Sequence, residues 1–132
     1  LGIFLQVDNC IAEEIPNLSY SKNFQYVCSE ALVPMPEKAN VNAEKELSKV
    51  VHLYSCLYYL RGLSENTYLM VDFLKKNGNN SLNNLCLPNS GLNDHESLYM
   101  FLEFLGKQKL TSEDTTRVSF FVALTEKFRC QK

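Results

Sequence analysis

Residues 43–76 read AEKELSKVVHLYSCLYYLRGLSENTYLMVDFLKK, and this stretch decides the fold class. Its apolar residues recur every three or four positions, which is the spacing of one face of a helix. Gly62 is a typical helix stop, and Ser64 shortly after it is a typical N-cap. The stretch therefore predicts two helices, over 43–61 and 64–76, that pack as a tight helical pair.

A second helical pair follows further along the chain. Asp94 suits the N-cap of a helix over 94–105, and Gly106 closes that helix. Acidic residues in a first turn then favour another helix, which starts at 111 or 112 and runs to 128. Signals for a strand are confined to Leu1–Val7, and none alternates with helices in a βαβ order. The predicted fold class is all-α.

The overall composition excludes several classes of protein. The chain has 132 residues, of which 45% are apolar, and 13 Lys and Arg stand against 15 Asp and Glu. This length fits one domain, and the apolar content is too high for a disordered tail. There is no cationic surplus for nucleic acid or an anionic membrane, and no apolar run is long enough to span a bilayer. Because the first residue is Leu1 rather than Met, we expect a processed chain or a piece of a longer one.

The five cysteines leave two interpretations open. Their number is odd and they are widely spaced, without a Cys-x-x-Cys pair or a Cys/His cluster, so we expect no zinc site. They fit either reduced thiols in an intracellular core, which we favour, or two long-range disulfides in a secreted protein. Two N-glycosylation sequons, at Asn17 and Asn79, keep the secreted alternative open. The cysteines are Cys10, Cys28, Cys56, Cys86 and Cys130.

The sequence offers little for catalysis. The only histidines, His52 and His95, are isolated, and neither has a Cys or Ser at a recognisable nucleophile spacing. No Gly-rich phosphate loop, H-E-x-x-H or G-x-S-x-G motif occurs. We therefore expect no enzyme, no metal and no cofactor, and a protein or peptide as the partner.

A weak internal repeat has a period of 45 residues. At this shift Cys56 coincides with Phe101, and Leu60 coincides with Leu105. A period of about 40 to 47 residues is that of armadillo and HEAT units. The chain would then be a single domain of about three helical units. Its apolar ends would be covered by flanking chain, by a second protein or by self-association.

The junction motifs resemble those of armadillo repeats. Cys56–Asn66, followed by Lys76-Asn77-Gly78, resembles the turn between a long helix and the short helix of the next unit, and Glu14–Ser19 resembles the same turn one unit earlier. The resemblance implies stacked helical pairs whose long helices line a concave surface. Such a surface binds an extended peptide or a partner helix.

The same resemblance implies a set of binding residues. Asn17 stands at the position of the groove asparagine, and Lys107 stands at the equivalent position two units later. Aromatic side chains one turn earlier would supply rigid contact area, and acidic ones would attract a basic ligand. The expected partner-binding residues are Glu13, Asn17, Tyr58, Tyr59, Glu103 and Lys107.

A second resemblance belongs to another class of protein. Cys28-Ser29-Glu30 and Ala43–Leu47 resemble the loop into the second helix of short-chain cytokines of the interleukin-four and interleukin-thirteen group. This resemblance implies a secreted four-helix bundle that acts as a receptor ligand. It also implies disulfides that join Cys10 to Cys130 and Cys56 to Cys86. The first resemblance implies an intracellular protein instead.

Overall fold

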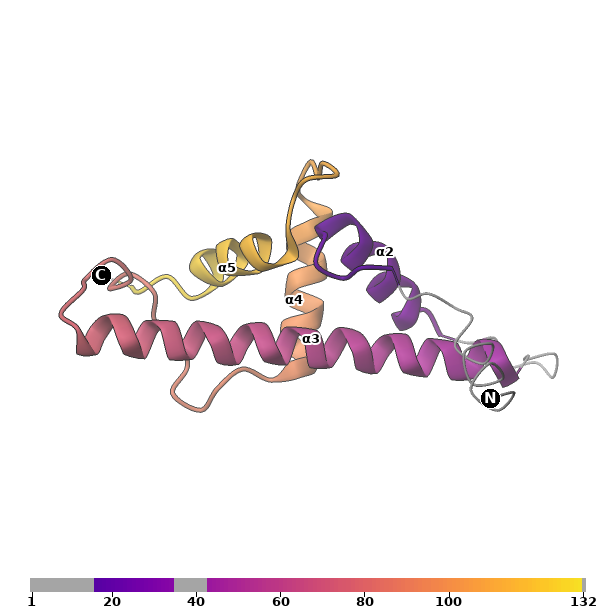
Figure 1. The fold of residues 1–132 in the computed structure, drawn as a ribbon, viewed down its shortest axis with the longest axis horizontal. Coiled ribbons are helices and arrows are strands. Elements are labelled where there is room, and N and C mark those ends of the chain that lie inside the picture. Colours follow the sequence, from indigo (N-terminus) through magenta and orange to yellow (C-terminus); the bar gives the residue numbers. More distant parts are fainter. Residues whose placement is uncertain (1–15, 35–42, 132) are drawn as a thin grey trace, which may run out of the picture.

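The computed structural model describes residues 16–34 and 43–131. In these residues it forms four helices and no strand, so the predicted all-α fold class is confirmed. The longest helix runs the length of the molecule, and another helix crosses behind it (Figure 1). The helices are α2 (Ser21–Leu32), α3 (Ala43–Lys76), α4 (Asp94–Gly106) and α5 (Thr116–Lys127).

The predicted break at Gly62 does not form, because α3 is one continuous helix of 34 residues. Gly62 keeps a negative φ, and one glycine costs a helix interior only about 1 kcal/mol relative to alanine. The hydroxyl of Ser64 caps no helix; it donates a hydrogen bond of 2.8 Å to the carbonyl of Leu60, one turn back. The junction motif quoted for the repeat, Cys56–Asn66, therefore lies inside one helix.

The other helix boundaries differ less from the prediction. The N-cap of α4 is Asn93 rather than Asp94, and its side-chain oxygen accepts a hydrogen bond of 3.0 Å from the amide of Glu96. The last helix begins at Thr116, not at 111 or 112. Residues 111–114 instead form a turn in which the carboxylate of Asp114 accepts from the amide of residue 111 at 2.6 Å. Polar side chains that bond to the local backbone favour such a turn over a helix.

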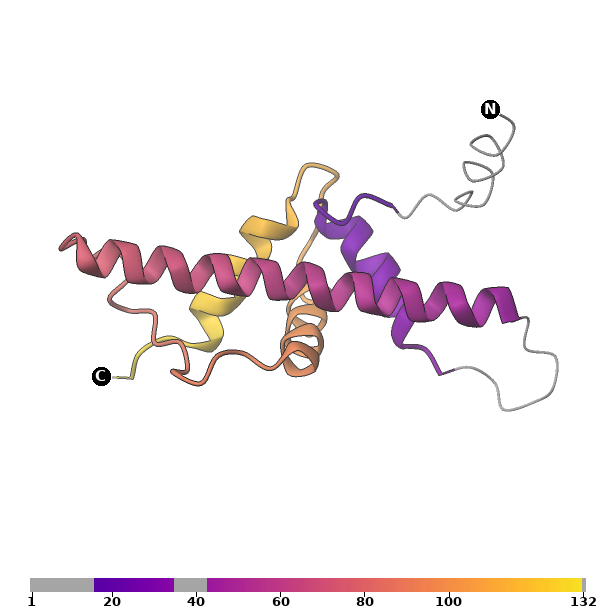
Figure 2. The same cartoon turned by 60° about the horizontal axis from the view of Figure 1, so that its bottom comes forward.

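The core is built around the ring of Phe101 in α4. This ring lies 5.2 Å from that of Phe24 in α2 and 5.2 Å from that of Phe120 in α5. All three rings are buried. α2 packs beside the N-terminal half of α3 and α5 beside its C-terminal half, as two views show (Figures 1 and 2). α4 therefore lies between α2 and α5 and contacts both of them as well as α3.

Two disulfides are present, and they correct both earlier expectations. Cys28 in α2 is bonded to Cys56 in α3, and Cys86 is bonded to Cys130. The preferred interpretation, five reduced thiols, is therefore wrong, and so are the implied pairs Cys10–Cys130 and Cys56–Cys86. The reason is packing: Cys56 belongs to the face of α3 that contacts α2, where Cys28 is also buried.

The second disulfide joins two segments that are also paired by backbone hydrogen bonds. The amide of Cys86 donates to the carbonyl of Phe128 at 2.7 Å, and the amide of Cys130 donates to that of Asn84 at 2.8 Å. These bonds align the two cysteines on neighbouring segments. The pairing of Cys130 is thus set by local contacts rather than by an N-terminal partner.

The described chain begins beside the start of α5. The amide of Thr116 donates to the carbonyl of Ser19 at 2.8 Å, and the amide of Ser21 donates to that of Asp114 at 2.9 Å. The hydroxyls of Ser21 and Ser119 lie 2.8 Å apart. These bonds anchor residues 19–21 to the start of α5. The expectations for residues 1–7 lie outside the described residues.

Candidate protein-binding surfaces

α3 is apolar on two faces, of which only one is covered. The buried face contacts the other helices and includes Cys56, Leu60 and Val71. Successive helical residues are turned by about 100°, which places a second row of apolar residues roughly 140° away from that face. This second row, here called the outer stripe, consists of Leu47, Val51, Tyr54 and Tyr58.

The outer stripe is exposed along its whole length. Its side chains are exposed by 64%, 44%, 54% and 61% from Leu47 to Tyr58. The rings of Tyr54 and Tyr58 stack with their centroids 6.1 Å apart. Scattered exposed apolar residues are ordinary, but a row at helical spacing is a contiguous surface of the kind that marks an interaction site.

A basic side chain closes one end of the outer stripe. The guanidinium carbon of Arg61 lies 5.5 Å from the centroid of the Tyr58 ring. Arg61 also forms an ion pair with Asp94 at the start of α4, with one hydrogen bond of 3.1 Å from Nε. The hydrogen bond to Asp94 and the charge of that carboxylate raise the pKa of Arg61 above its usual value. These contacts hold the guanidinium beside the aromatic pair.

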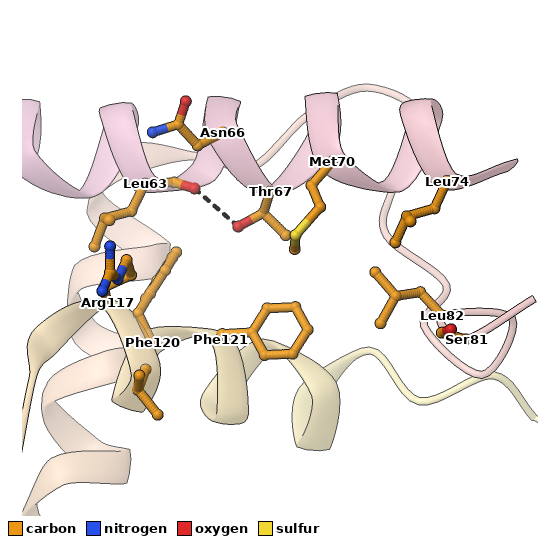
Figure 3. Close-up of a pocket in the computed structure, with 11 residues that line it drawn as sticks. Leu63, Asn66, Thr67, Met70, Leu74, Ser81, Leu82, Arg117, Phe120 and Phe121 are labelled. Carbon is orange, nitrogen blue, oxygen red and sulfur yellow. Dashed lines mark hydrogen bonds between the residues drawn. The ribbon is translucent and has the colours of Figure 1, made fainter. Parts of the chain in front are cut away.

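A second surface is the groove between the C-terminal half of α3 and α5, here called the α3/α5 groove. It has a volume of about 420 Å³, and its walls are almost entirely apolar. Leu63 and Arg117 lie at one end, Met70 and Phe121 lie across the middle, and Leu74 lies at the other end with Leu82 (Figure 3).

Arg117 is the one charged side chain in the lining of this groove. No ion pair joins it to a carboxylate within the described ranges 16–34 and 43–131. Its charge acts on Tyr59: burial raises the pKa of that phenol, and the positive charge of Arg117 partly offsets the rise. Arg117 is therefore a cation with capacity for a further acidic partner.

The structure separates the two tyrosines that were predicted as contacts. Tyr58 points to solvent, whereas the ring of Tyr59 lies 6.0 Å from that of Phe24 and packs at the edge of the core. The difference follows from the turn of about 100° between neighbours in a helix. Only Tyr58 is available to a partner without displacing other side chains.

The remaining predicted contacts do not join Tyr58. Lys107 and Glu103 pair with each other on the surface of α4, at 3.2 Å. Arg61 is paired with Asp94 at the start of α4. Glu103 lies nine residues after Asp94, which is about 14 Å further along the axis of α4. Asn17 supports a turn, since its side chain accepts from the amide two residues later at 3.0 Å. Glu13 lies outside the described residues.

The described part of the chain holds neither a cluster of metal ligands nor a helix that could span a membrane. There, no group of three or more His, Cys, Asp or Glu residues is placed to hold a metal ion. Among the same residues, no helix is both long and apolar enough to cross a membrane. Comparisons with protein-family models, curated proteins and solved structures found no match to this chain.

Sequence reasoning missed three of the four outer-stripe residues and the whole groove. Leu47, Val51 and Tyr54 were counted with the single apolar face of a helix. The signal was nevertheless present, because 43–61 holds too many apolar residues for one face. Around the helix axis these apolar positions fall into two rows, separated by the turn of about 100° per residue.

Proposed function

We propose that this chain is a protein-interaction module without catalytic activity, and that the outer stripe of α3 binds an amphipathic helix of a partner protein. The exposed aromatic pair Tyr54 and Tyr58, with Arg61 beside it, is the observation that supports this proposal. Tyrosine and arginine are among the residues that contribute most to binding energy in protein interfaces. A tyrosine ring also loses little conformational entropy when it is covered.

The spacing of the stripe favours a helix as the ligand. Its members follow one another at intervals of four, three and four residues. This is the spacing of a coiled-coil seam, which receives the side chains of a second helix. From its first residue to its last the stripe rises by about 16 Å, which is the length of three helical turns. We therefore expect a partner helix of at least three turns with an apolar seam.

The function is tested by capture and reconstitution with the full chain. Wild-type protein, Tyr58→Ala and the control Tyr26→Ala are immobilised, and the retained proteins are identified by mass spectrometry. Tyr26 is a matched control because it is also a highly exposed tyrosine, but on α2. Binding of the best candidate is then measured with purified components. We expect Tyr58→Ala to raise the Kd by about tenfold or more, and Tyr26→Ala to leave it unchanged.

The proposal fails if Tyr58→Ala and Tyr26→Ala retain the same proteins with the same Kd as the wild type. Circular dichroism of each variant is needed beside the binding data. A Tyr58→Ala protein that binds weakly because it is unfolded would show that this residue supports the fold.

A second candidate function is that of a secreted receptor ligand. The disulfides Cys28–Cys56 and Cys86–Cys130 favour it, because such bonds persist in oxidising compartments and are rare in the cytosol. The same stripe would then contact an extracellular receptor. The first candidate places the partner inside the cell, and an intracellular location would require the four cysteines to stay paired there.

Binding to intact cells discriminates between the two candidates. Fluorescently labelled protein is added to cells before and after permeabilisation. Saturable binding to intact cells that Tyr58→Ala abolishes and Tyr26→Ala retains would support the receptor ligand. Binding that requires permeabilisation would support the intracellular module.

A further inference from the structure

We propose that the α3/α5 groove binds one fatty-acid anion, with its carboxylate at Arg117 and its hydrocarbon chain along the groove towards Leu74. This site is separate from the outer stripe, and the proposal does not depend on the proposed function. It rests on the apolar interior of the groove, on the difference between its two ends, on the charge of Arg117 and on the dimensions of the space.

The interior of the groove is apolar and in contact with water. Met70 on α3 and Phe121 on α5 lie across the middle from each other (Figure 3). Met70 is 41% exposed, and Val118, which also lines the groove, is 57% exposed. The described part of the chain therefore leaves these side chains open to solvent, and a hydrocarbon ligand would gain free energy by covering them.

Polar groups in the lining do not compete for a ligand. The hydroxyl of Thr67 donates to the carbonyl of Leu63 at 2.8 Å, and the hydroxyl of Ser81 donates to the side-chain oxygen of Asn79. The side-chain amide of Asn66 points towards the other side of α3 (Figure 3). A polar ligand would lose water in the middle of the groove without gaining new hydrogen bonds, so the interior favours hydrocarbon.

The two ends of the groove differ in charge. Leu74 and Leu82 lie at one end (Figure 3), and the turn that carries Leu82 is anchored by Leu85, which is buried. The carbonyl of Leu82 accepts a hydrogen bond of 3.0 Å from the amide of Leu85. Arg117 lies at the opposite end, beside Leu63. A ligand with one charged head and an apolar tail matches this order.

The charge of Arg117 favours an acidic head group. Within residues 16–34 and 43–131 no ion pair neutralises this charge. The nearby phenol of Tyr59 stays neutral at pH 7, because burial raises its pKa. A guanidinium presents a planar set of donors that can bind a carboxylate through two parallel hydrogen bonds. A carboxylate at this end of the groove would therefore be both neutralised and oriented.

The dimensions of the groove fit a single hydrocarbon chain. Its volume of about 420 Å³ is that of a small-molecule site. From Leu63 to Leu74 the α3 wall rises by about 16 Å. Carbon–carbon bonds of about 1.5 Å in a zigzag advance roughly 1.3 Å per carbon, so a chain of about twelve carbons covers this distance. A helix of that length has a volume of roughly 1,200 Å³ with its side chains and would not fit inside the groove.

Calorimetric titration of the full chain with dodecanoate, below the concentration at which it forms micelles, tests the proposal. We expect one bound molecule per chain. Octanoate should bind about tenfold more weakly or worse, because each buried methylene changes the Kd by about fourfold. Dodecyltrimethylammonium has the same tail with a positive head, and it should also lose about tenfold in affinity. Absence of dodecanoate binding, or equal affinity for the two ligands with the same tail, would overturn the proposal.

Two substitutions on α5 test the position of the head group. Arg117→Gln removes the charge at the groove, and Lys127→Gln removes a charge from an exposed site on the same helix, outside the groove. We expect Arg117→Gln to raise the Kd of dodecanoate by about tenfold and Lys127→Gln to leave it unchanged. Circular dichroism confirms that both variants are folded. Equal effects of the two would mean that only the net charge of the protein matters, and the proposed site would be wrong.

The position of the tail is read from Met70 without a substitution. Hydrogen peroxide oxidises an accessible methionine thioether to the sulfoxide and is itself reduced to water. Dodecanoate should slow the oxidation of Met70 by about fivefold or more, because the chain would cover the thioether. Met100, on α4 and outside the groove, is the internal control, and its rate should not change. Peptide mapping gives both rates, and an unchanged rate at Met70 would contradict the proposal.

Vesicles of phosphatidylglycerol distinguish a free fatty acid from a membrane as the source of the acyl chain. We expect the protein to bind monomeric dodecanoate and to remain in the supernatant when the vesicles are sedimented. Sedimentation with the vesicles without binding of dodecanoate would mean that this surface contacts a bilayer, and the proposal would be wrong.

Discussion

The buried face and the outer stripe of α3 have similar side chains but different surroundings. On the buried face, Leu60 is fully covered by the neighbouring helices, and Cys56 is bonded to Cys28. On the outer stripe, Val51 and Tyr58 are exposed to solvent. One apolar face therefore supplies stability, and the other is available for binding. Substitutions on the two faces should separate these two contributions.

The largest effect is expected from removal of the Cys28–Cys56 disulfide. Replacing both cysteines by alanine should lower the free energy of unfolding by about 4 kcal/mol, because the loop between them is released and two buried sulfurs are lost. Urea unfolding without reductant measures the change.

The matched control is the double replacement of Cys86 and Cys130. Loop entropy alone would make the loss of stability larger for this second pair, because Cys86 and Cys130 are 44 residues apart whereas Cys28 and Cys56 are 28 apart. If the free energy of unfolding falls more on removal of Cys86–Cys130 than on removal of Cys28–Cys56, burial on the buried face of α3 does not dominate.

Leu60→Ala should have the next largest effect. Removing this fully buried side chain should cost about 3 kcal/mol, because it leaves a cavity in the core. Leu69→Ala removes the same atoms from a side chain that is 67% exposed on the same helix, and it should cost less than about 0.5 kcal/mol. Thermal or urea unfolding of both variants gives the difference. Equal losses would mean that the outer side of α3 is covered in the native protein.

A glycine substitution tests whether α3 is one helix. Gly62→Ala should raise the free energy of unfolding by about 1 kcal/mol, because the backbone there is helical and an added Cβ meets no atom within 4 Å. The control is Gly78→Ala, which should destabilise the protein because Gly78 has a φ of +70°. A loss of stability in Gly62→Ala would indicate the turn that the sequence first suggested.

The smallest effect on stability is expected for Tyr58→Ala. The free energy of unfolding should fall by about 0.5 kcal/mol, mainly through the lost contact with Arg61. Differential scanning calorimetry is precise enough for this change. A decrease as large as that of Leu60→Ala would place Tyr58 in the core and remove the basis for the proposed binding surface.

Much of the fold could be predicted from the sequence, because helices leave a strong local signal. The end of α3 at Lys76 and the closure of α4 at Gly106 follow from capping residues and periodicity. The continuity of α3 could not be predicted, since a single glycine is compatible with either a turn or a helix. Tertiary packing on both sides of Gly62 decides between them.

The disulfides and the surfaces depend on contacts between distant segments. Five cysteines allow many pairings, and no local pattern selects Cys28 with Cys56. Tyr58 was named as a contact through the armadillo resemblance, and its role in binding stays a prediction. The α3/α5 groove was missed because its walls come from segments far apart in the sequence, at Met70 and Phe121.

The order of the disulfides along the chain has a consequence for proteolysis. Cys28–Cys56 closes one covalent ring, and Cys86–Cys130 closes a second ring that neither overlaps nor encloses the first. Only the peptide chain from residue 57 to 85 links the two rings, and its exposed segment at 77–78 is open to a protease. One cut there leaves two intact rings held together only by non-covalent packing, so denaturant alone, without reductant, would separate the fragments.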